Sequence, residues 1–397
     1  MNSDNTLLID MVRKLCNELS QTQMDTTGDG GMSLAHLWQK VENFGLPYFM
    51  LPADAGGFDG GWAQAARLFQ LFGEYALPLP VGETIIARHY LHRAQSLSPQ
   101  PLPTVAEAPI SLAHCRDAVI TPDGARHLFS GALRNVAWAV QTDLLVSATV
   151  ADEPVLALLT RDQLASGSTC EIDSYSNTAA EPRGHLRCHR LPVVALWRMP
   201  AGTNLMTAGA LLRSAQMSGA MQSILSRTIN YALERKQFGR AIGKFQVIQH
   251  DLARLAEQAA AAQCAALNAA RAADMEGGAE AAEFEIAAAK LRANMAVAPA
   301  TTIAHQVHGA IGFTLEHPLH HFTQRLFAWR SEFGNDRYWS TILGNTLRGL
   351  GGAGLWPFLT ARGDRQVVAG QAVDHSEDTG AGIAMHGTES QTHPSEA

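Results

Sequence analysis

The chain has 397 residues, a formal charge of −7 and a hydrophobic content of 46%. That length allows two or three domains with a sizeable core. The acidic balance argues against a nucleic-acid binder, since neutralising phosphates needs clustered Lys and Arg. The N-terminus lacks the basic start and apolar run of a signal peptide, and no apolar run approaches the length of a membrane span. We therefore expect a cytoplasmic protein that has no membrane partner.

The cysteines also favour a reducing compartment. They are Cys16, Cys115, Cys170, Cys188 and Cys264. None forms a CxxC pair and their number is odd, so neither a disulfide framework nor a zinc site is expected.

Residues 1–102 are predicted to form a helical domain. Apolar residues recur at helical spacing from Leu7 to Leu15. A polar, glycine-rich loop is expected at Thr26–Gly31. Further helices are expected at Leu34–Phe44, Ala63–Ala76 and Glu83–Leu91.

Residues 103–202 are predicted to form a small antiparallel β domain. The segments here are short, rich in β-branched residues and separated by turn signals such as Thr121–Gly124. Leu144–Val150 and Val155–Leu159 are expected to be apolar strands joined by the segment Ala151–Pro154.

Residues 203–363 return to a helical pattern. Long helices are expected from Leu205, at Phe245–Ala273, at Glu280–Gly309 and at Asp336–Leu347. Long antiparallel helices joined by short loops predict a four-helix bundle. Residues 364–397 lose the apolar periodicity and are expected to be a disordered tail. The predicted fold class is mainly α with a central small antiparallel β domain, flanked by an N-terminal helical domain and a C-terminal bundle.

The first chemical motif lies between two of the long helices. It reads Arg-x-Gln-Phe-Gly followed by Phe-Gln, formed by Arg235, Gln237, Phe238, Gly239, Phe245 and Gln246. A guanidinium supplies the fixed fork of donors that a pyrophosphate needs, and Phe238 offers an apolar face to an adenine or flavin. This segment resembles the corresponding turn of acyl-CoA dehydrogenases. The resemblance implies that Arg235, Gln237, Phe238 and Gln246 contact the FAD of a neighbouring subunit.

A second motif follows at the distance that the family has. Gln306–Phe313 matches the family pattern Gln-x-x-Gly-Gly-x-Gly-[Phe/Tyr], except that Ala310 stands where a second glycine is usual. The resemblance implies that Gln306 and the backbone of Gly309 also contact the partner's FAD. It is strong from about Leu205 to about Leu350 and weak over the first 200 residues.

A group of histidines nearby resembles a metal-ligand cluster. Its members are His305, His308, His317, His320 and His321. No carboxylate lies at helical spacing from His305 and His308, and zinc needs three or four ligands, so no metal is predicted. Glu316, His317 and Pro318 fit the family's Glu-[Tyr/His]-Pro stretch.

The position of the catalytic base is ambiguous. In the family a glutamate in a Tyr-Glu-Gly-Thr loop removes the α-proton of the thioester. An ungapped count from Phe313 places Phe333 there, and a shift of one residue places Glu332 there. A related branch carries its glutamate on the first long helix, where this chain has Gly209. Glu332 is therefore the predicted base, with Asp336 as the next candidate, provided that an apolar pocket raises its pKa. The alternative is that Glu332 is a solvated loop carboxylate.

The β domain departs further from the family pattern, which has Trp-Ile-[Ser/Thr] packed on the flavin. Trp138 supplies the tryptophan, while Val140 replaces the hydroxyl residue. A buried strand tryptophan is also a common core residue. We predict flavin stacking for Trp138, with a core role as the alternative.

The resemblance implies an enzyme that uses FAD for α,β-dehydrogenation of an acyl-CoA and passes electrons to an electron-transfer flavoprotein. The cofactor residues imply a homo- or hetero-oligomer. The drift in the first 200 residues is similar to that of bacterial subunits for bulky thioesters, such as steroid side chains, where two different chains assemble. Two alternatives stay open: a non-catalytic partner subunit that completes another chain's FAD site, and an acyl-CoA oxidase.

Overall fold

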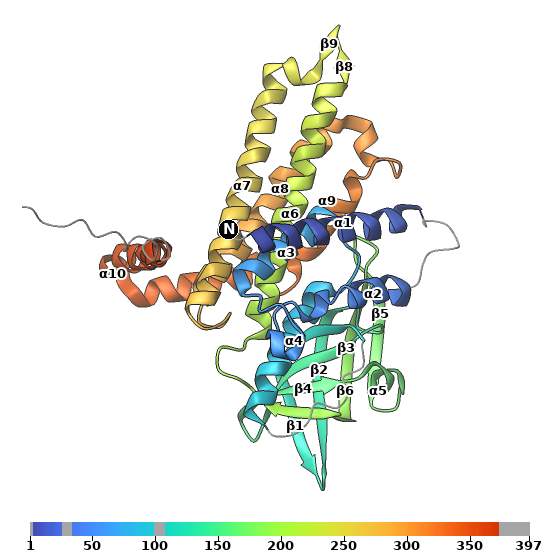
Figure 1. Ribbon diagram of the computed structural model, residues 1–397, viewed down its shortest axis with the longest axis vertical. Helices are drawn as coiled ribbons and strands as arrows, with labels where there is room; N and C mark the ends of the chain where they lie inside the picture. Colours follow the sequence, from blue (N-terminus) through green and yellow to red (C-terminus); the bar gives the residue numbers. More distant parts are fainter. Residues whose placement is uncertain (1–2, 26–33, 99–107, 373–397) are drawn as a thin grey trace, which may run out of the picture. The chain divides into compact units, whose positions relative to one another are not determined.

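The computed structural model describes residues 3–25, 34–98 and 108–372. The chain divides by its internal contacts into two compact units, Met1–Asn345 and Thr346–Ala397, and each is described by itself. The first unit contains N-terminal helices, one large β-sheet and a bundle of long helices (Figure 1). The predicted fold class is thereby confirmed. The limits predicted between the three domains stay predictions, since all three lie mainly within this unit.

The N-terminal region is helical. Its helices are α1 (Ser3–Asp25), α2 (Leu34–Asn43), α3 (Trp62–Glu74) and α4 (Val81–Leu97), with 3-10 turns at Leu46–Tyr48 and Ala53–Ala55. Each predicted helix is present, but α1 and α4 extend beyond the predicted ends at Leu15 and Leu91. The loop predicted at Thr26–Gly31 lies outside the described residues.

Helix α3 packs tightly against the long helix α6 (Leu205–Glu234). A Cβ added to Gly73 would lie 1.8 Å from the Gln216 carbonyl oxygen, and one added to Gly219 would lie 1.9 Å from the Gln70 carbonyl oxygen. The two helices can approach this closely only because glycine has no side chain at each contact. Phe69 and Phe72 fill the adjoining core.

The sheet has the strand order β5-β6-β2-β1-β3-β4-β7. Its strands are β1 (Ile110–Asp123), β2 (Arg126–Ala137), β3 (Asp143–Val150), β4 (Glu153–Leu159), β5 (Cys170–Ser176), β6 (Pro182–Pro192) and β7 (Ala195–Arg198), and the short helix α5 (Arg161–Ala165) precedes β5. The sheet is antiparallel, as predicted, except at one pair, where β1 and β3 run parallel. That pairing is non-local, and local residue patterns do not specify it.

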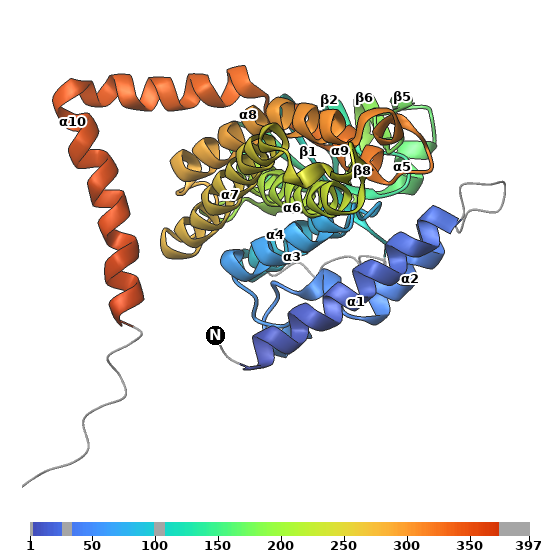
Figure 2. The same ribbon diagram turned by 90° about the horizontal axis from the view of Figure 1, so that it is seen from above.

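The bundle contains α6, α7 (Gln246–Met275), α8 (Glu283–His308) and α9 (Leu319–Ser331). The first three run side by side in both views (Figures 1 and 2). Helix α7 meets its neighbours mainly through buried alanines, which allow close axes. The element α9 corrects the prediction: it packs against α6 and α8, whereas the sequence suggested only a loop and a helix start there.

The last helix, α10 (Asp336–Ala372), is longer than the predicted Asp336–Leu347 and changes direction at Gly351, where φ is +66°. Trp339 of its first turns is fully buried in the core of the first unit. The predicted tail begins at residue 364, but the helix continues to Ala372, which corrects that limit. Residues 373–397 lie outside the described part of the chain.

Candidate functional site

A two-residue hairpin joins α6 to α7 at one end of the bundle (Figure 1). Its strands are β8 (Lys236–Gln237) and β9 (Arg240–Ala241), and Gln237 pairs with Arg240. Phe238 and Gly239 at the tip have φ values of +50° and +77°. A positive φ is unfavourable for a bulky residue. The hairpin thus holds Phe238 in a strained conformation, with its ring 91% exposed.

The second motif lies at the same end of the bundle. Helix α8 ends at His308, and the 3-10 turn Gly309–Phe313 follows. The His308 ring stacks on Tyr231 of α6 with ring centroids 4.6 Å apart. This contact brings the Gln306 and Gly309 segment beside the end of α6 that carries Arg235.

The residues at this end of the bundle that are predicted to bind FAD are exposed. The members of this bundle-end cluster are Arg235, Gln237, Phe238, Gln246, Gln306 and Gly309. Within residues 3–25, 34–98 and 108–372, no side-chain hydrogen bond or ion pair is found for the Arg235 guanidinium or for the three glutamine amides. A Cβ at Gly309 would meet nothing within 4 Å, so its backbone is open to a ligand. Free donors, an exposed aromatic ring and an open glycine fit one part of a dinucleotide.

The nearby histidines are partly held by rings and backbone. His305 stacks on Phe313 at 4.4 Å, His308 lies 4.7 Å from His317, and His320 lies 4.0 Å from His321 between ring centroids. Burial lowers the pKa values of His305, His308 and His317, and that of His321 to about 4. Among the described residues no group of three or more His, Cys, Asp or Glu side chains could hold a metal ion.

A chain of buried charges runs between the other elements. This buried ion chain is Glu83–Arg213–Glu332–Arg183–Glu181–Arg325, and each member is at most 5% exposed. Arg213 Nη2 donates to Glu83 at 2.6 Å, and Arg213 Nε donates to Glu332 at 2.7 Å. Arg183 donates to Glu332 through Nε at 2.8 Å and to Glu181 through Nη2 at 2.9 Å. Arg325 Nε lies 2.9 Å from Glu181, which closes the series.

The ion chain links distant parts of the fold through Glu332. It draws Glu83 from α4, Arg213 from α6, Arg183 from β6 and Arg325 from α9. The three carboxylates and three guanidiniums of these pairs balance in charge. Burial alone would raise the pKa of the Glu332 carboxyl, but Arg183 and Arg213 outweigh it and hold that pKa below its usual value. An α-proton acceptor needs the opposite shift.

The two other positions that the family uses for a base meet in space. A Cβ on Gly209 would lie 2.2 Å from the Phe333 ring, so that ring covers Gly209. Phe333 has a φ of +49° and Gly334 a φ of +97°, which turn the chain between α9 and α10. The surroundings of Glu332, Phe333 and Gly209 therefore favour an anchoring role for Glu332 over proton abstraction.

Lys290 holds the same loop from α8. Its ammonium is fully buried and donates to Asn294 Oδ1 at 2.7 Å and to the carbonyls of Trp329, Arg330 and Gly334, each at 3.1 Å. These carbonyls lie at the C-terminal end of α9 and beyond it, where a cation satisfies unpaired acceptors. Burial lowers the pKa of Lys290 to about 7. The loop between α9 and α10 is thus held by Lys290 of α8 as well as by the buried ion chain.

A hollow of about 190 Å³ lies between the sheet and this loop. Its lining includes Asn135, Val136 and Ala137 on one side and Glu332 and Phe333 on the other. Trp138 is not in the lining: it is buried in a turn, and its backbone N–H donates to the Pro182 carbonyl. Its stacking on a flavin stays a prediction, and the turn contacts favour the core alternative.

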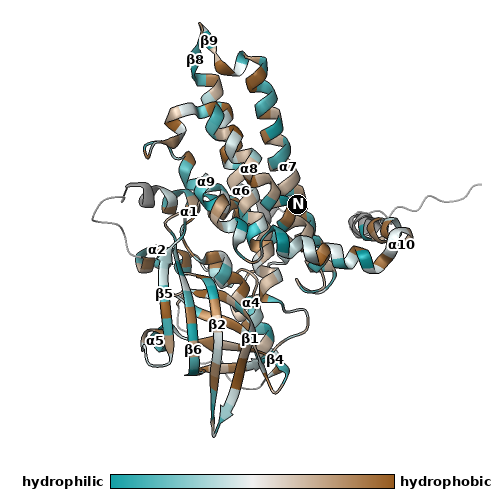
Figure 3. Cartoon of the chain, turned by 180° about the vertical axis from the view of Figure 1, so that it is seen from behind, coloured by the Kyte–Doolittle hydropathy of each residue, from teal (hydrophilic) through white to brown (hydrophobic). Residues whose placement is uncertain are grey.

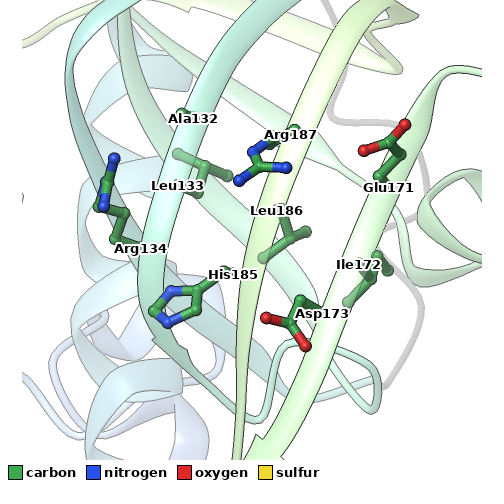
Figure 4. Close-up of a pocket in the computed structure, with 9 residues that line it drawn as sticks. All are labelled: Ala132, Leu133, Arg134, Glu171, Ile172, Asp173, His185, Leu186 and Arg187. Carbon is green, nitrogen blue, oxygen red and sulfur yellow. The ribbon is translucent and has the colours of Figure 1, made fainter.

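A second hollow, of about 360 Å³, lies on the outer face of the sheet (Figure 4). Its charged lining comes from Arg134 of β2, His185 and Arg187 of β6, and Glu171 and Asp173 of β5. Glu171 lies opposite Arg187, and Asp173 lies opposite His185. Opposite charges on neighbouring strands are typical of a solvated sheet face. None of the predicted site residues lies there.

The sequence prediction missed Arg213, Arg183, Glu83 and Lys290. A signal was present, because Arg213 interrupts a buried apolar run of α6 and Lys290 interrupts an alanine-rich run of α8. A lone charge in such a run is buried only when it is paired. The neighbouring sequence does not indicate which residues are the partners, because the partners lie on other elements.

The geometry agrees with comparisons to known proteins. Residues 200–344 match the family model described as acyl-CoA dehydrogenase, C-terminal domain. The acyl-CoA dehydrogenase IpdE2 of Mycobacterium tuberculosis is 27% identical over 294 residues, which are 73% of this chain and 79% of the relative. The bundle of this chain thus matches the C-terminal domain of acyl-CoA dehydrogenases, and the chain is similar to members of that family. This similarity points to an oxidoreductase of the kind that dehydrogenates acyl-CoA thioesters.

Solved structures share the fold. A steroid acyl-CoA dehydrogenase, the Tcur3481-Tcur3483 G363A variant, has a TM-score of 0.74 at 23% identity and covers 86% of this chain and 97% of that one. The ChsE4-ChsE5 complex from Mycobacterium tuberculosis has a TM-score of 0.73 at 20% identity and covers 87% and 97%. No described helix of this chain has an apolar stretch long enough to cross a membrane.

Proposed function

We propose that this chain is a subunit of an oligomeric, FAD-dependent acyl-CoA dehydrogenase that oxidises the Cα–Cβ bond of a thioester and passes the electrons to an electron-transfer flavoprotein. The bundle-end cluster carries the proposal. Arg235, Gln237 and Gln306 expose donors that have no partner in the described part of the chain, and Phe238 is 91% exposed. Exposed, unpaired donors beside an exposed aromatic ring are expected where another subunit and its cofactor cover them.

In this proposal the chain's residues bind and orient the cofactor. The Arg235 guanidinium would hold the pyrophosphate through charge-assisted hydrogen bonds, with Gln237, Gln246, Gln306 and the open backbone at Gly309 supplying further donors. Phe238 would pack on the adenine side. When bound, FAD supplies the hydride acceptor that the reaction requires. The partner is either a second copy or a related chain, and the fold shared with the ChsE4-ChsE5 complex supports the latter.

A specific observation favours one of the alternatives, the non-catalytic partner subunit. Glu332 accepts hydrogen bonds from two arginines, and its pKa is lowered by them. A carboxylate held in this way is a weak proton acceptor. In this second candidate function, the chain completes the FAD site of a different chain, which supplies the base.

The test is dehydrogenation of a panel of acyl-CoAs, bulky thioesters included, followed by flavin bleaching. The assembly with the partner chain should bleach, and Arg235→Ala should reduce its flavin content. If Glu332→Gln in a folded assembly lowers turnover by two to four decades, Glu332 is the base. If it does not, while a change of the partner's glutamate does, the second function holds. Absence of bleaching with every thioester would contradict both.

A further inference from the structure

Two cysteines that lie far apart in the sequence meet on neighbouring strands. Cys170 opens β5 and Cys188 lies near the end of β6, directly opposite it in the strand register. Their Sγ atoms are 2.9 Å apart, and both thiols are free and buried. A disulfide needs an Sγ–Sγ distance of about 2.05 Å, so a small rotation of the side chains brings them to bonding distance.

The register suits a cross-strand bond. The His189 N–H donates to the Thr169 carbonyl at 2.8 Å, so the pair next to Cys170 and Cys188 is hydrogen-bonded. In an antiparallel ladder the next pair is then non-hydrogen-bonded, with Cα atoms about 4.5 Å apart and side chains close together. That separation lies within the range of about 4.4–6.8 Å that disulfides adopt.

Both sulfurs point to the same side of the sheet. Cys170 and Cys188 belong to the apolar cluster on the inner face. The alternating residues Glu171 and Arg187 line the hollow on the outer face (Figure 4). No side chain has to change faces for the sulfurs to bond.

We propose that Cys170 and Cys188 form a reversible redox modification site, which closes to a cross-strand disulfide in the presence of a disulfide oxidant of the glutathione class. The site is independent of the proposed flavin function. The structure represents its reduced form.

Access to the pair comes through β5. This strand lies at one edge of the sheet and, among the described strands, pairs with β6 alone. It is largely hydrophilic (Figure 3), and most of its residues after Cys170 are exposed. An edge strand with few buried side chains opens locally more readily than a central strand. Such opening exposes both thiols together.

The chemistry is thiol–disulfide exchange. The hydrogen bond from Cys188 lowers the pKa of the Cys170 thiol even though burial opposes this. The Cys170 thiolate attacks oxidised glutathione, forms a mixed disulfide and releases one glutathione thiolate. The Cys188 thiol loses its proton to solvent, attacks the Cys170 sulfur and displaces the second glutathione. Two protein thiols are oxidised, and one glutathione disulfide is reduced to two thiols.

The bond would fix the edge of the sheet. It would join β5 covalently to β6, the strand on which Arg183 of the buried ion chain also lies. Closing the segment between Cys170 and Cys188 restricts the unfolded chain and stabilises the fold. Oxidation should therefore suppress the opening of β5.

The test uses the full-length protein in the assembly in which it purifies. The protein is incubated with increasing oxidised glutathione, blocked with N-ethylmaleimide, unfolded and digested, and its disulfides are mapped by mass spectrometry. We expect two of the five thiols to be lost, a peptide linking Cys170 to Cys188, and full recovery with dithiothreitol. Backbone amides of β5 should exchange with deuterium at least tenfold more slowly after oxidation.

Variants distinguish this pair from the other thiols. Cys264→Ser, at an exposed cysteine, should still lose two thiols. Cys170→Ser and Cys188→Ser should give no internal link. The wild-type mapping needs no variant, so a folding defect in either serine variant leaves the test intact. Five thiols retained at every glutathione ratio, a link from Cys188 to Cys115 instead, or unchanged exchange in β5 would overturn the proposal.

Discussion

Replacing Glu332 by glutamine tests whether this residue stabilises the fold through its ion pairs or acts as a catalytic base. Glutamine keeps the size but removes the charge that both Arg183 and Arg213 contact, within 2.8 Å. Its amide also presents donors to guanidiniums that can only donate. We expect Glu332→Gln to lower the free energy of unfolding by about 3–5 kcal/mol, the range for removing one partner of a buried ion pair.

The magnitude follows from the contacts. One opposite charge at about 4 Å contributes about 4 kcal/mol at an effective dielectric constant of about 20, so two arginines contribute about 8 kcal/mol. The variant avoids the desolvation cost of burying a carboxylate, which is several kcal/mol. The expected loss in the free energy of unfolding is the ion-pair contribution minus this desolvation cost. A base in an open apolar pocket has no such partners, and its replacement would leave stability nearly unchanged.

The assay is urea unfolding of both proteins at pH 7, with Glu153→Gln as the control. Glu153 is exposed at the start of β4, and its change should alter the free energy of unfolding by no more than about 0.5 kcal/mol. Because the pKa of Glu332 is lowered in the fold, its contribution is present above the ordinary glutamate pKa of about 4.3 and is lost as pH falls through the folded value. A loss below about 1 kcal/mol at pH 7 would refute the anchoring role.

Three further predictions follow from other parts of the chain. Arg235→Ala should weaken FAD retention by about one to two decades, because a charge-assisted contact contributes about 1.5–3 kcal/mol. The control variant Arg126→Ala, on the exposed end of β2, should retain FAD as the wild type does. Equal flavin content in the two variants after dialysis would contradict the assignment. Burial lowers the pKa of His89 to about 4, so the stability that its neutral form contributes is present above about pH 6.5 and is lost as pH falls towards 4. Between pH 6.5 and 5, the free energy of unfolding of His89→Gln should fall by about 2 kcal/mol less than that of the wild type in urea titrations. An equal fall in the two proteins would argue against this contribution. Ending the chain after Gly363 should change the free energy of unfolding by less than about 2 kcal/mol in the same assay, and a larger loss would show that the removed residues pack on the fold.

The parts of the fold that follow from local pattern were predicted from the sequence. The α6–α7 hairpin was found because its apolar period, its glycine and its Arg-x-Gln-Phe-Gly turn are contiguous, and the end of α8 was found for the same reason. Helix α9 was missed because its two histidines and its other polar residues conceal the short apolar face formed by Leu319, Phe322 and Leu326.

The parts that depend on distant residues were not predictable in this way. The parallel pairing of β1 with β3, the opposition of Cys170 to Cys188 and the buried ion chain each join residues from separate elements. Glu332 illustrates the limit. Its place in the sequence suggested a base, and only the positions of Arg183 and Arg213 reveal an environment that lowers its pKa.

The most direct test of the proposed function is the mass of the species that carries flavin. The chain is purified alone and together with its partner chain, and light scattering is recorded with flavin absorbance during size-exclusion chromatography. We expect flavin only in an oligomer, and a reduced flavin content per oligomer when Arg235 and Gln306 are both changed to alanine. A monomer that retains FAD, or an oligomer whose flavin content is unchanged in that double variant, would contradict a bundle end that serves a neighbouring subunit.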